Sequence, residues 1–510
     1  MTRDRLSRRA CLTLLAAGAA AGLLAACGST APAAAPSAAT VSSATRAASP
    51  ASSAAQPATS AATSAAPTSA VASSASSSPS GVATSATAAA APASAATPTA
   101  VPVVIKPGMT PVRLRVHWGG LTQAALQKQV IDPFNNGPGA QQKIQLVVEQ
   151  VPDSQFTEKM IASKLGGDPP DIYHPSASVK VLAQQQLGNP LPPDEGAYVK
   201  QNYYPGAGDR LTFQGKVYGY PTEFQPLGYI YRKSFFKEAG LTAPPATLGE
   251  QFDIAQKLTQ KQGTTVTRIG FTIMQSRLPQ NFATWISRFG GQMYTFDGDH
   301  PTKIDVASPQ AIDAVTYLKK LVDAGVTEGQ LDYGGAWTKS QAASAEIEVW
   351  FSLISIRDAG KPDVFADLGA ATVPPNAGVQ PTWYFYGYGL VPANGAKHAD
   401  GASQVMKALM HKPAMPWSHF IVETVGSPPA PTDYPVPIPG WTDDLTQAYA
   451  VQAPKIAAPR PEEKVLGVSE LRKAYSATIN DILANKISVQ SGLSTLNPQL
   501  NDILKRTDPA

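Results

Sequence analysis

The sequence predicts an α/β fold for the region from residue 106 onward, and three observations support this prediction. Residues 112–175 alternate between strand-like and helix-like patterns, the order typical of a parallel α/β unit. Residues 28–101 consist almost entirely of Ala, Ser, Thr and Pro, and this composition ends before the alternation begins. The roughly 400 residues that follow are enough for a large, divided core.

The N-terminal 27 residues have the organisation of an export signal. Four arginines precede residues 10–26, an uncharged stretch rich in Leu and Ala that is slightly short for a membrane span. Arg8-Arg9 resembles a twin-arginine signal, and an ordinary basic region is an equal alternative. Residues 24–27, Leu-Ala-Ala-Cys, resemble the lipobox of bacterial lipoproteins. This resemblance implies cleavage before Cys27, a lipid on its thiol and a place on the outer face of the cytoplasmic membrane.

Residues 28–105 are expected to form a disordered tether. Arg46 is the one charged side chain in residues 28–101, which also lack aromatic residues, so this segment cannot bury enough apolar surface to offset its ordering entropy. Its many prolines argue against a helix. Such a tether would hold the folded domain, residues 106–510, away from the membrane.

Charge and cysteine content exclude several classes of protein. The formal net charge is +4, and the four arginines and one aspartate of residues 1–27 supply +3 of it, which argues against a nucleic-acid-binding protein. The two cysteines are Cys11 and Cys27, so the folded domain contains neither a disulfide nor a thiolate metal site. The six histidines are scattered, and no metal or other cofactor is expected.

The elements of the folded domain follow one another in a regular order. Asp153 or Ser154 is expected to cap a helix that ends near Leu165. A capping box at Thr247 to Glu250 predicts a helix to about residue 261, and Ser308-Pro309 predicts one to Ala324. Before these, a helix is expected at 121–134. The predicted strands are residues 112–118, 143–151, 171–175, 268–273, 347–352, 369–374 and 386–393.

The region beyond residue 400 is expected to be mainly helical. Prolines interrupt it between residues 428 and 439. Residues 482–504 belong to this region, and Pro498 is expected to interrupt a helix there.

Three motifs in this order resemble one family. They are FTEKMIASKLGGDPPDI (156–172), GKVYGYP (215–221) and YIYRKSFFKEAGLTAPPATLGE (229–250). The chain from Val112 to Leu504 is similar to the family 1 extracellular solute-binding proteins, the sugar-type receptors of ABC importers. It departs from the family pattern at Arg232, where asparagine is usual, and at Leu248, where tryptophan is usual.

The resemblance implies a two-lobed periplasmic-binding-protein fold, type II-like, with strands that cross a hinge and a helical C-terminal region. The first lobe would comprise mainly residues 111–222 and about 390–430, the second mainly 226–385, with the C-terminal helices shared. It also implies a monomer that binds a small solute, most plausibly a saccharide, and docks on the transmembrane subunits of an ABC permease.

Aromatic side chains indicate where a saccharide could bind. They are concentrated among the glycines and prolines of residues 215–232, and tyrosine and tryptophan offer both an apolar face and a polar atom to a sugar. Core packing is the alternative for each ring, evenly balanced for Tyr220 and Phe224 and slightly favoured for Trp285. The candidate ligand-binding residues are Trp118, Asp171, Tyr220, Glu223, Phe224, Trp285, Trp350, Trp383 and Tyr384.

The sequence therefore predicts an exported, lipid-anchored solute-binding protein that is not an enzyme. One alternative is a tethered glycoside hydrolase, which needs two carboxylates at a working separation. Asp171, Glu223, Glu346 and Glu348 could supply such a pair, and their spacing selects none. A second alternative is a solute-sensing wall protein of the same fold.

Overall fold

A computed structural model describes residues 104–118, 120–273, 278–327, 341–348 and 361–509. The export signal, the lipobox at Cys27, nearly all of the expected tether and the candidate residue Trp350 lie outside the described residues. Among the residues that are described, no helix combines the length and the apolar character needed to cross a membrane.

The first lobe is built on a five-stranded sheet with the order β2-β1-β3-β15-β6. Strand β1 is parallel to β2 and β3, whereas β15 is antiparallel to β3 and β6. The buried residues Val112, Leu114 and Val116 of β1 anchor its core. The strands are β1 (Thr110–Val116), β2 (Ile144–Gln150), β3 (Ile172–Tyr173), β6 (Tyr220–Pro221) and β15 (Gly389–Pro392).

Short helices and one small hairpin complete the first lobe. The helix predicted at 121–134 is present as three consecutive segments, α1, η1 and α2. The helices are α1 (Gly120–Leu126), η1 (Gln127–Ile131), α2 (Asp132–Asn136), α3 (Pro138–Gln141), η2 (Asp153–Gln155), α4 (Phe156–Leu165), α5 (Val179–Gln184), α6 (Pro193–Asn202), α7 (Pro205–Arg210), α15 (Ala399–Met410), α16 (Pro416–His419) and η3 (Phe420–Val425), and the hairpin pairs β4 (Thr212–Phe213) with β5 (Lys216–Val217).

The second lobe is built on a sheet in which β7 is the central strand. Strand β7 pairs antiparallel with β12, β13 and β14, and β14 pairs in parallel with β16. Two hairpins, β8 with β9 and β10 with β11, extend from this lobe. The strands are β7 (Gln225–Arg232), β8 (Gln260–Gln262), β9 (Thr265–Arg268), β10 (Tyr294–Asp297), β11 (His300–Ile304), β12 (Ser344–Glu348), β13 (Leu368–Ala371), β14 (Trp383–Tyr386) and β16 (Ala457–Pro459).

Helices α8 to α11, α19 and α20 share one large core of the second lobe, whereas α14, α17, η4 and α18 pack in two smaller clusters. The Thr247 hydroxyl accepts a hydrogen bond from the Glu250 backbone N–H, and the Ser308 hydroxyl accepts one from Ala311, so both predicted caps are confirmed. The helices are α8 (Lys233–Glu238), α9 (Leu248–Leu258), α10 (Leu278–Ser287), α11 (Pro309–Asp323), α14 (Pro362–Ala366), α17 (Asp443–Leu445), η4 (Thr446–Gln452), α18 (Ala453–Ile456), η5 (Pro461–Lys464), α19 (Val468–Leu483) and α20 (Val489–Thr507).

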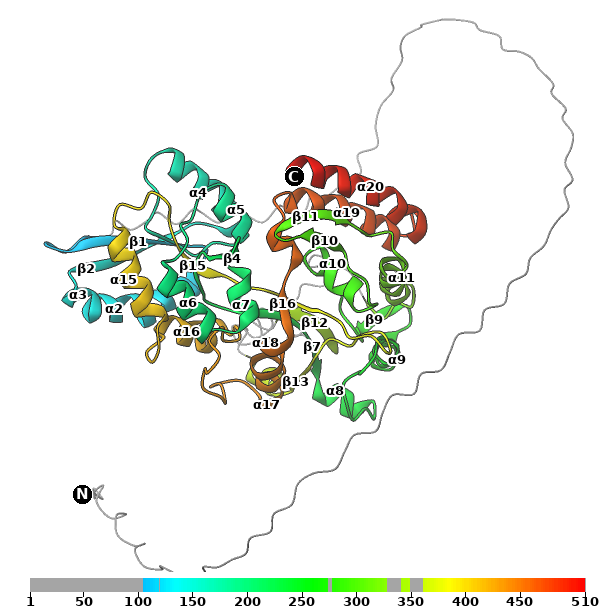
Figure 1. Cartoon of the computed structure of the whole chain (residues 1–510). Coiled ribbons are helices and arrows are strands. Elements are labelled where there is room, and N and C mark those ends of the chain that lie inside the picture. Colours follow the sequence, from blue (N-terminus) through cyan, green and yellow to red (C-terminus); the bar gives the residue numbers. More distant parts are fainter. Residues whose placement is uncertain (1–103, 119, 274–277, 328–340, 349–360, 510) are drawn as a thin grey trace, which may run out of the picture. The chain divides into compact units, whose positions relative to one another are not determined.

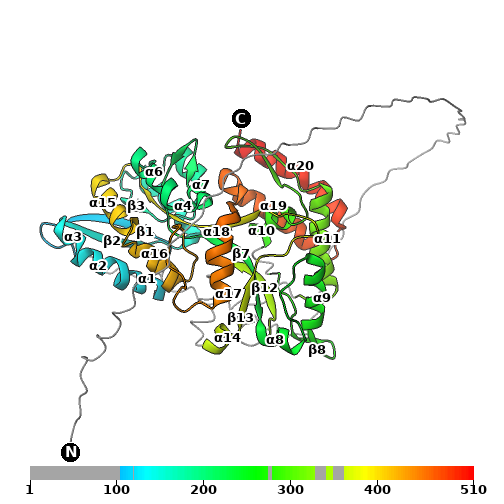
Figure 2. The ribbon, with the colours of Figure 1, turned by 60° about the horizontal axis from the view of Figure 1, so that its bottom comes forward.

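The two lobes are joined by strands that leave one sheet and enter the other. The chain passes from β6 to β7 through residues 222–224 and from β14 to β15 through Gly387-Tyr388. Figures 1 and 2 both show the blue to teal elements with α15 on one side of these strands, and the green elements with α19 and α20 on the other. The two-lobed α/β fold predicted from the family resemblance is thus confirmed.

Four details differ from the prediction. The single strand expected at 386–393 is two strands, because the chain changes sheets at Gly387, where a Cβ would lie 2.4 Å from the carbonyl oxygen of Glu223. Helix α4 begins without a side-chain cap, since Asp153 and its neighbour form the turn η2 instead. Residues 269–273 form only isolated bridges. Helix α20 continues through Pro498, because buried leucines on both sides hold it against the core.

A buried ion pair lies inside the second lobe. Arg288 is fully buried; its Nη1 donates to Glu346 at 2.7 Å and its Nε donates to the carbonyl oxygen of Pro374 at 2.7 Å. Gln251 donates to the other Glu346 oxygen at 2.8 Å. Neither charge can be removed alone without leaving its partner unpaired in the core.

We expect Arg288→Met to lower the free energy of unfolding by about 3–5 kcal/mol, because Glu346 would remain charged and buried. The double variant Arg288→Met/Glu346→Met should recover much of this loss. Urea unfolding of the three proteins measures both effects. Arg506→Met, which breaks the exposed pair with Glu470, is the matched control and should leave the midpoint unchanged. Equal losses in the single and double variants would contradict the assignment.

Candidate functional site

The carboxyl ends of the parallel strands in the first lobe bring aromatic and imidazole rings together. His117 and Trp118 follow β1, and His174 follows β3. The His117 ring stacks on Tyr388 with centroids 4.4 Å apart, and the Trp118 ring lies 4.5 Å from His174 and 5.8 Å from Trp417. We call these five residues the aromatic cluster. Ligands of open α/β sheets bind beside such strand ends, which is the reason Trp118 is a candidate.

Residues 222–224 are hydrogen-bonded to the two other described segments that pass between the lobes, which are Gly387-Tyr388 and the segment that leads from η3 to α17. The Thr222 N–H donates to the carbonyl of Tyr388 at 3.0 Å, and the Phe224 N–H donates to that of Pro428 at 3.3 Å. Between them, the Glu223 carboxylate accepts hydrogen bonds from Gln225 and Ser427, both at 2.8 Å. Glu223 therefore lies where all three passages of the chain meet.

The second oxygen of Glu223 has no hydrogen-bond partner within the described part of the chain and lies 3.9 Å from Nε2 of His174. Burial raises the pKa of Glu223 to about 7, although Ser427, Gln225 and the charge of Arg210 oppose the increase. Burial also holds the pKa of His174 well below its ordinary value, and the charges of His117 and Arg210 lower it further. The His174 ring is therefore neutral at pH 7, and Glu223 titrates near that pH.

A cavity of about 460 Å³ lies between the lobes. Helices α5 and α7 and the β4–β5 hairpin bound it on the side of the first lobe, and the β10–β11 hairpin, Tyr384 and residues 459–464 bound it on the other side. Its size suits a small polar ligand.

Among the described residues, several buried polar atoms of residues that line this cavity have no hydrogen-bond partner. They are Nε and Nη2 of Arg210, the hydroxyl of Tyr294 and one carboxylate oxygen of Glu463. Arg210 and Glu463 form an ion pair at 3.4 Å whose geometry is too poor for a hydrogen bond. Buried polar groups normally satisfy their hydrogen-bonding capacity, so these atoms could bind a ligand that both donates and accepts.

Three other charged residues at the cavity, Lys464, Asp299 and Arg460, already have partners. The Lys464 ammonium lies 2.7 Å from Asp299, which also accepts a hydrogen bond from the Gln214 backbone N–H of the first lobe at 2.8 Å. Arg460 donates to Asn281 at 2.9 Å. The cavity is therefore lined by positively charged donors and by negatively charged acceptors.

Tyr386 connects the cavity to the aromatic cluster. The guanidinium carbons of Arg210 and Arg460 lie 5.2 Å and 5.4 Å from the centre of its ring. Its hydroxyl donates to the carbonyl of Ser176 at 3.1 Å, and its ring lies 5.0 Å from that of Tyr388. Tyr386 therefore contacts both arginines at the cavity and Tyr388, which lies in a segment that joins the lobes.

Of the predicted site residues that the structure describes, only Tyr384 lines this cavity. Four others are buried in cores. Tyr220 donates to Glu195 inside the first lobe, Phe224 stacks on Phe385 at 4.3 Å, and Trp285 packs against Arg288. Trp383 is 5% exposed and packs beside Phe224. These four rings pack in the apolar cores, which is the alternative considered for them, and they do not line the cavity.

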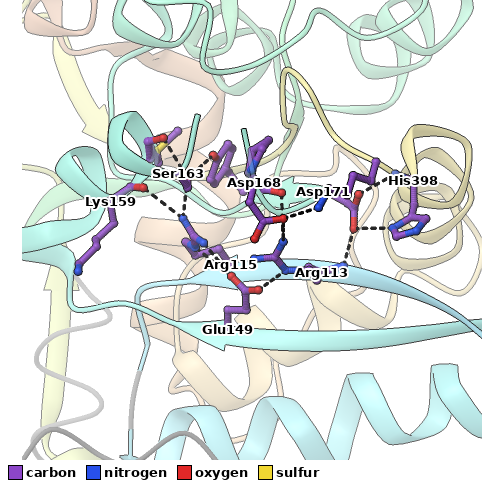
Figure 3. Close-up of polar contacts among 12 residues, drawn as sticks. Arg113, Arg115, Glu149, Lys159, Ser163, Asp168, Asp171 and His398 are labelled. Atoms are coloured by element: carbon purple, nitrogen blue, oxygen red, sulfur yellow. Dashed lines mark hydrogen bonds and ion pairs between the residues drawn. The ribbon is translucent and has the colours of Figure 1, made fainter. Parts of the chain in front are cut away.

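The carboxylate of Asp171 is hydrogen-bonded to backbone groups of the first lobe (Figure 3). It accepts hydrogen bonds from the backbone N–H groups of Arg113 at 2.8 Å and of His398 at 2.9 Å. Asp171 thereby ties β1 and β3 to the start of α15. Beside it, Glu149 bridges Arg113 and Arg115, and Arg115 donates to Ser163 of α4 at 3.0 Å. Asp171 is thus placed as a structural residue of the first lobe.

Sequence reasoning missed Arg210, Tyr294 and Glu463. One signal was available for Glu463, because residues 459–464 read PRPEEK. Four charged residues lie there beside two prolines, after the last Pro-rich stretch. Arg210 and Tyr294 carry no comparable signal, since the cavity forms only when segments more than seventy residues apart in the sequence fold together.

Comparisons with known proteins agree with this architecture. Residues 129–446 match the family described as bacterial extracellular solute-binding protein. A Deinococcus radiodurans protein named probable ABC transporter-binding protein is 24% identical over 320 residues, which is 60% of this chain and 73% of that protein.

Two solved structures illustrate the similarity in fold. The cyclic alpha-maltosyl-1,6-maltose binding protein of Arthrobacter globiformis has a TM-score of 0.62 and 22% identity, covering 78% of this chain and all of that one. The sugar-binding protein MalE of Xanthomonas citri has a TM-score of 0.64 and 17% identity, covering 78% of this chain and 98% of that one. The family resemblance found in the sequence is confirmed.

We expect Glu223→Gln to change how stability depends on pH. The folded pKa of about 7 exceeds the ordinary value of 4.5, so the folded state binds this proton more tightly. The stability contributed by protonated Glu223 is fully present below pH 4.5 and is lost as the pH rises through about 7. The variant should therefore gain about 3 kcal/mol relative to the wild type between pH 4.5 and pH 8.

Urea unfolding of both proteins across this pH range tests the prediction. Because His174 lies 3.9 Å from Glu223, its opposite trend, a loss of stability as the pH falls below its ordinary pKa of 6.5, is removed by repeating the comparison in a His174→Gln background. Glu470→Gln, on the exposed surface, is the control. Parallel curves for wild type and Glu223→Gln would show that the carboxylate is not protonated in the folded state.

Proposed function

The chain belongs to the bacterial extracellular solute-binding protein family, and from this premise we propose that it captures a saccharide between its two lobes and delivers it to the permease of an ABC importer. Members of this family are exported proteins that bind solutes and are not enzymes. The saccharide, the importer and the membrane anchor are the parts that we propose.

The observation that carries the saccharide proposal is the mixed set of polar atoms, on residues that line the cavity, that lack a hydrogen-bond partner among the described residues. Arg210 and Tyr294 offer donors, and Glu463 offers an acceptor. A sugar hydroxyl both donates and accepts, so neighbouring hydroxyls could bond to Arg210 and Glu463 together. The half-buried ring of Tyr384 could pack against the C–H face of the sugar.

The names of similar proteins support the same reading. The Arthrobacter globiformis protein binds cyclic alpha-maltosyl-1,6-maltose, and another structure of this fold is a Thermotoga maritima MalE3 bound to maltose. The Deinococcus radiodurans relative is named for an ABC transporter. We extend saccharide binding and the importer from those proteins to this one as a proposal.

We expect the full chain to be stabilised by at least one saccharide. A ligand at a hundredfold excess over its dissociation constant adds about 2.7 kcal/mol to the free energy of unfolding, and the melting temperature rises by a few degrees. The panel should contain glucose, tagatose, maltose, maltotriose and cyclic maltodextrins, with glycerol and sorbitol as non-sugar polyols. A flat response to every sugar would refute the saccharide proposal, and slow consumption of a sugar would favour the tethered hydrolase.

Glu463→Gln then tests the cavity with the saccharide that gives the largest shift. Removing a charged acceptor from a buried hydroxyl costs about 1.5–3 kcal/mol, so the dissociation constant should rise roughly 10- to 150-fold by titration calorimetry. Glu470→Gln removes the same charge from the exposed surface and should bind normally. Unchanged affinity in Glu463→Gln would place the saccharide elsewhere between the lobes.

We also propose that lipid on Cys27 anchors the protein and that residues 28–105 act as a tether. Cys27→Ser should move the protein from the membrane fraction to the medium, because the lipid attaches to that thiol. Cys11→Ser, in the apolar part of the signal, should leave the protein in the membrane fraction. Immunoblots of both fractions measure this, and a membrane-bound Cys27→Ser protein would exclude the lipobox.

A further inference from the structure

A buried ion pair connects the two lobes at the side of the cavity. Lys180 lies on α5 of the first lobe, and Asp508 follows α20 of the second lobe. The Lys180 Nζ is 2.6 Å from Asp508 Oδ1, and the side chains are only 4% and 0% exposed. Val179, the neighbour of Lys180, lines the cavity. The pair therefore lies next to the space assigned to the solute.

Asp508 is held in place by the second lobe alone. Its carboxylate accepts hydrogen bonds from the backbone N–H groups of Leu466 at 3.0 Å and Gly467 at 3.4 Å, and from the Thr507 hydroxyl at 3.1 Å. A Cβ at Gly467 would lie 2.2 Å from Oγ1 of Thr507, so glycine lets the end of α20 pack against this segment. Asp508 would keep these partners if the lobes moved apart.

The Lys180 ammonium has fewer hydrogen-bond partners than the Asp508 carboxylate. Asp508 is the one hydrogen-bond and ion-pair partner found for its ammonium among the described residues. If the first lobe moved away, Lys180 would return to water, whereas with the lobes together its charge is removed from water. The contact between the lobes at this point is therefore tolerated because Asp508 supplies the opposite charge at contact distance, while Asp299, also of the second lobe, interacts with the Lys180 charge from farther away.

We infer that Lys180 and Asp508 are a positioning pair that sets the balance between lobes held together and lobes apart. Removing either charge would leave the other buried and unpaired in the joined state but solvated in the separated state. The separated state would then be favoured. Removing both charges would restore much of the balance, because no charge is left to bury. Solute residence time would follow this balance, whichever solute binds.

The balance can be measured without any solute, by single-molecule energy transfer between dyes on the two lobes. The full chain carries only Cys11 and Cys27, so replacing both by serine allows labelling at Lys200→Cys and Lys257→Cys, two exposed positions on α6 and α9. We expect Lys180→Met and Asp508→Asn each to lower the ratio of joined to separated molecules at least about tenfold.

The double variant Lys180→Met/Asp508→Asn should return most of the way to the wild-type ratio. Lys486→Met, which breaks an exposed ion pair with Asp481 on α19, is the control and should change nothing. Unchanged ratios in the single variants would overturn the inference. It would also be overturned if the double variant matched the singles, because the effect would then be lost packing.

Thermal unfolding of the same proteins separates this role from general destabilisation. A positioning role predicts that Asp508→Asn keeps a cooperative transition while the energy-transfer ratio changes. A ratio that changes only where the transition is lost would overturn the inference. Because no saccharide is added, failure of this test is distinct from failure of saccharide binding.

Discussion

The hydrogen bonds at residues 222–224 are the constraint on which the rest of this structure depends. The described chain passes three times between two sheets. In each passage its backbone N–H and C=O groups need hydrogen-bond partners outside the regular strand pairing of either sheet. Here the Thr222 and Phe224 N–H groups bond to the other two passages, and the Glu223 side chain bonds to Ser427. The passages therefore form one connected unit, and Gly387 is required because a side chain there would displace the Glu223 backbone.

The charges around this unit explain why polar groups gather between the lobes. The charge of Arg210 opposes the increase that burial causes in the pKa of Glu223 and adds to the decrease that burial causes in the pKa of His174, and Arg210 also pairs loosely with Glu463. Each of these groups is nearly inaccessible to solvent, so each must be balanced by a neighbour or by a ligand. The cavity is the place where this balance is incomplete, and a hydroxyl-rich solute would complete it.

The lobes themselves are stabilised in an ordinary way, by apolar cores and a few internal ion pairs. The Arg288–Glu346 pair belongs to one lobe and has no need of the other, whereas the Lys180–Asp508 pair exists only while the lobes are in contact. The first kind of pair affects whether a lobe folds. The second affects how the two folded lobes are arranged, which in a solute-binding protein is the step that retains the solute.

The sequence by itself determined the fold class and the family of this protein. Strand and helix periodicity, the caps at Thr247 and Ser308 and three family motifs are local signals, and a local signal can be read along the chain. Only the tertiary structure decided which rings are core and which polar groups meet. Tyr384 and Trp383 are neighbours in one strand, yet one lines the cavity and the other is buried, because successive side chains face opposite sides of a sheet. Arg210 and Glu463 lie 253 residues apart, and no pattern along the chain predicts that folding brings them together.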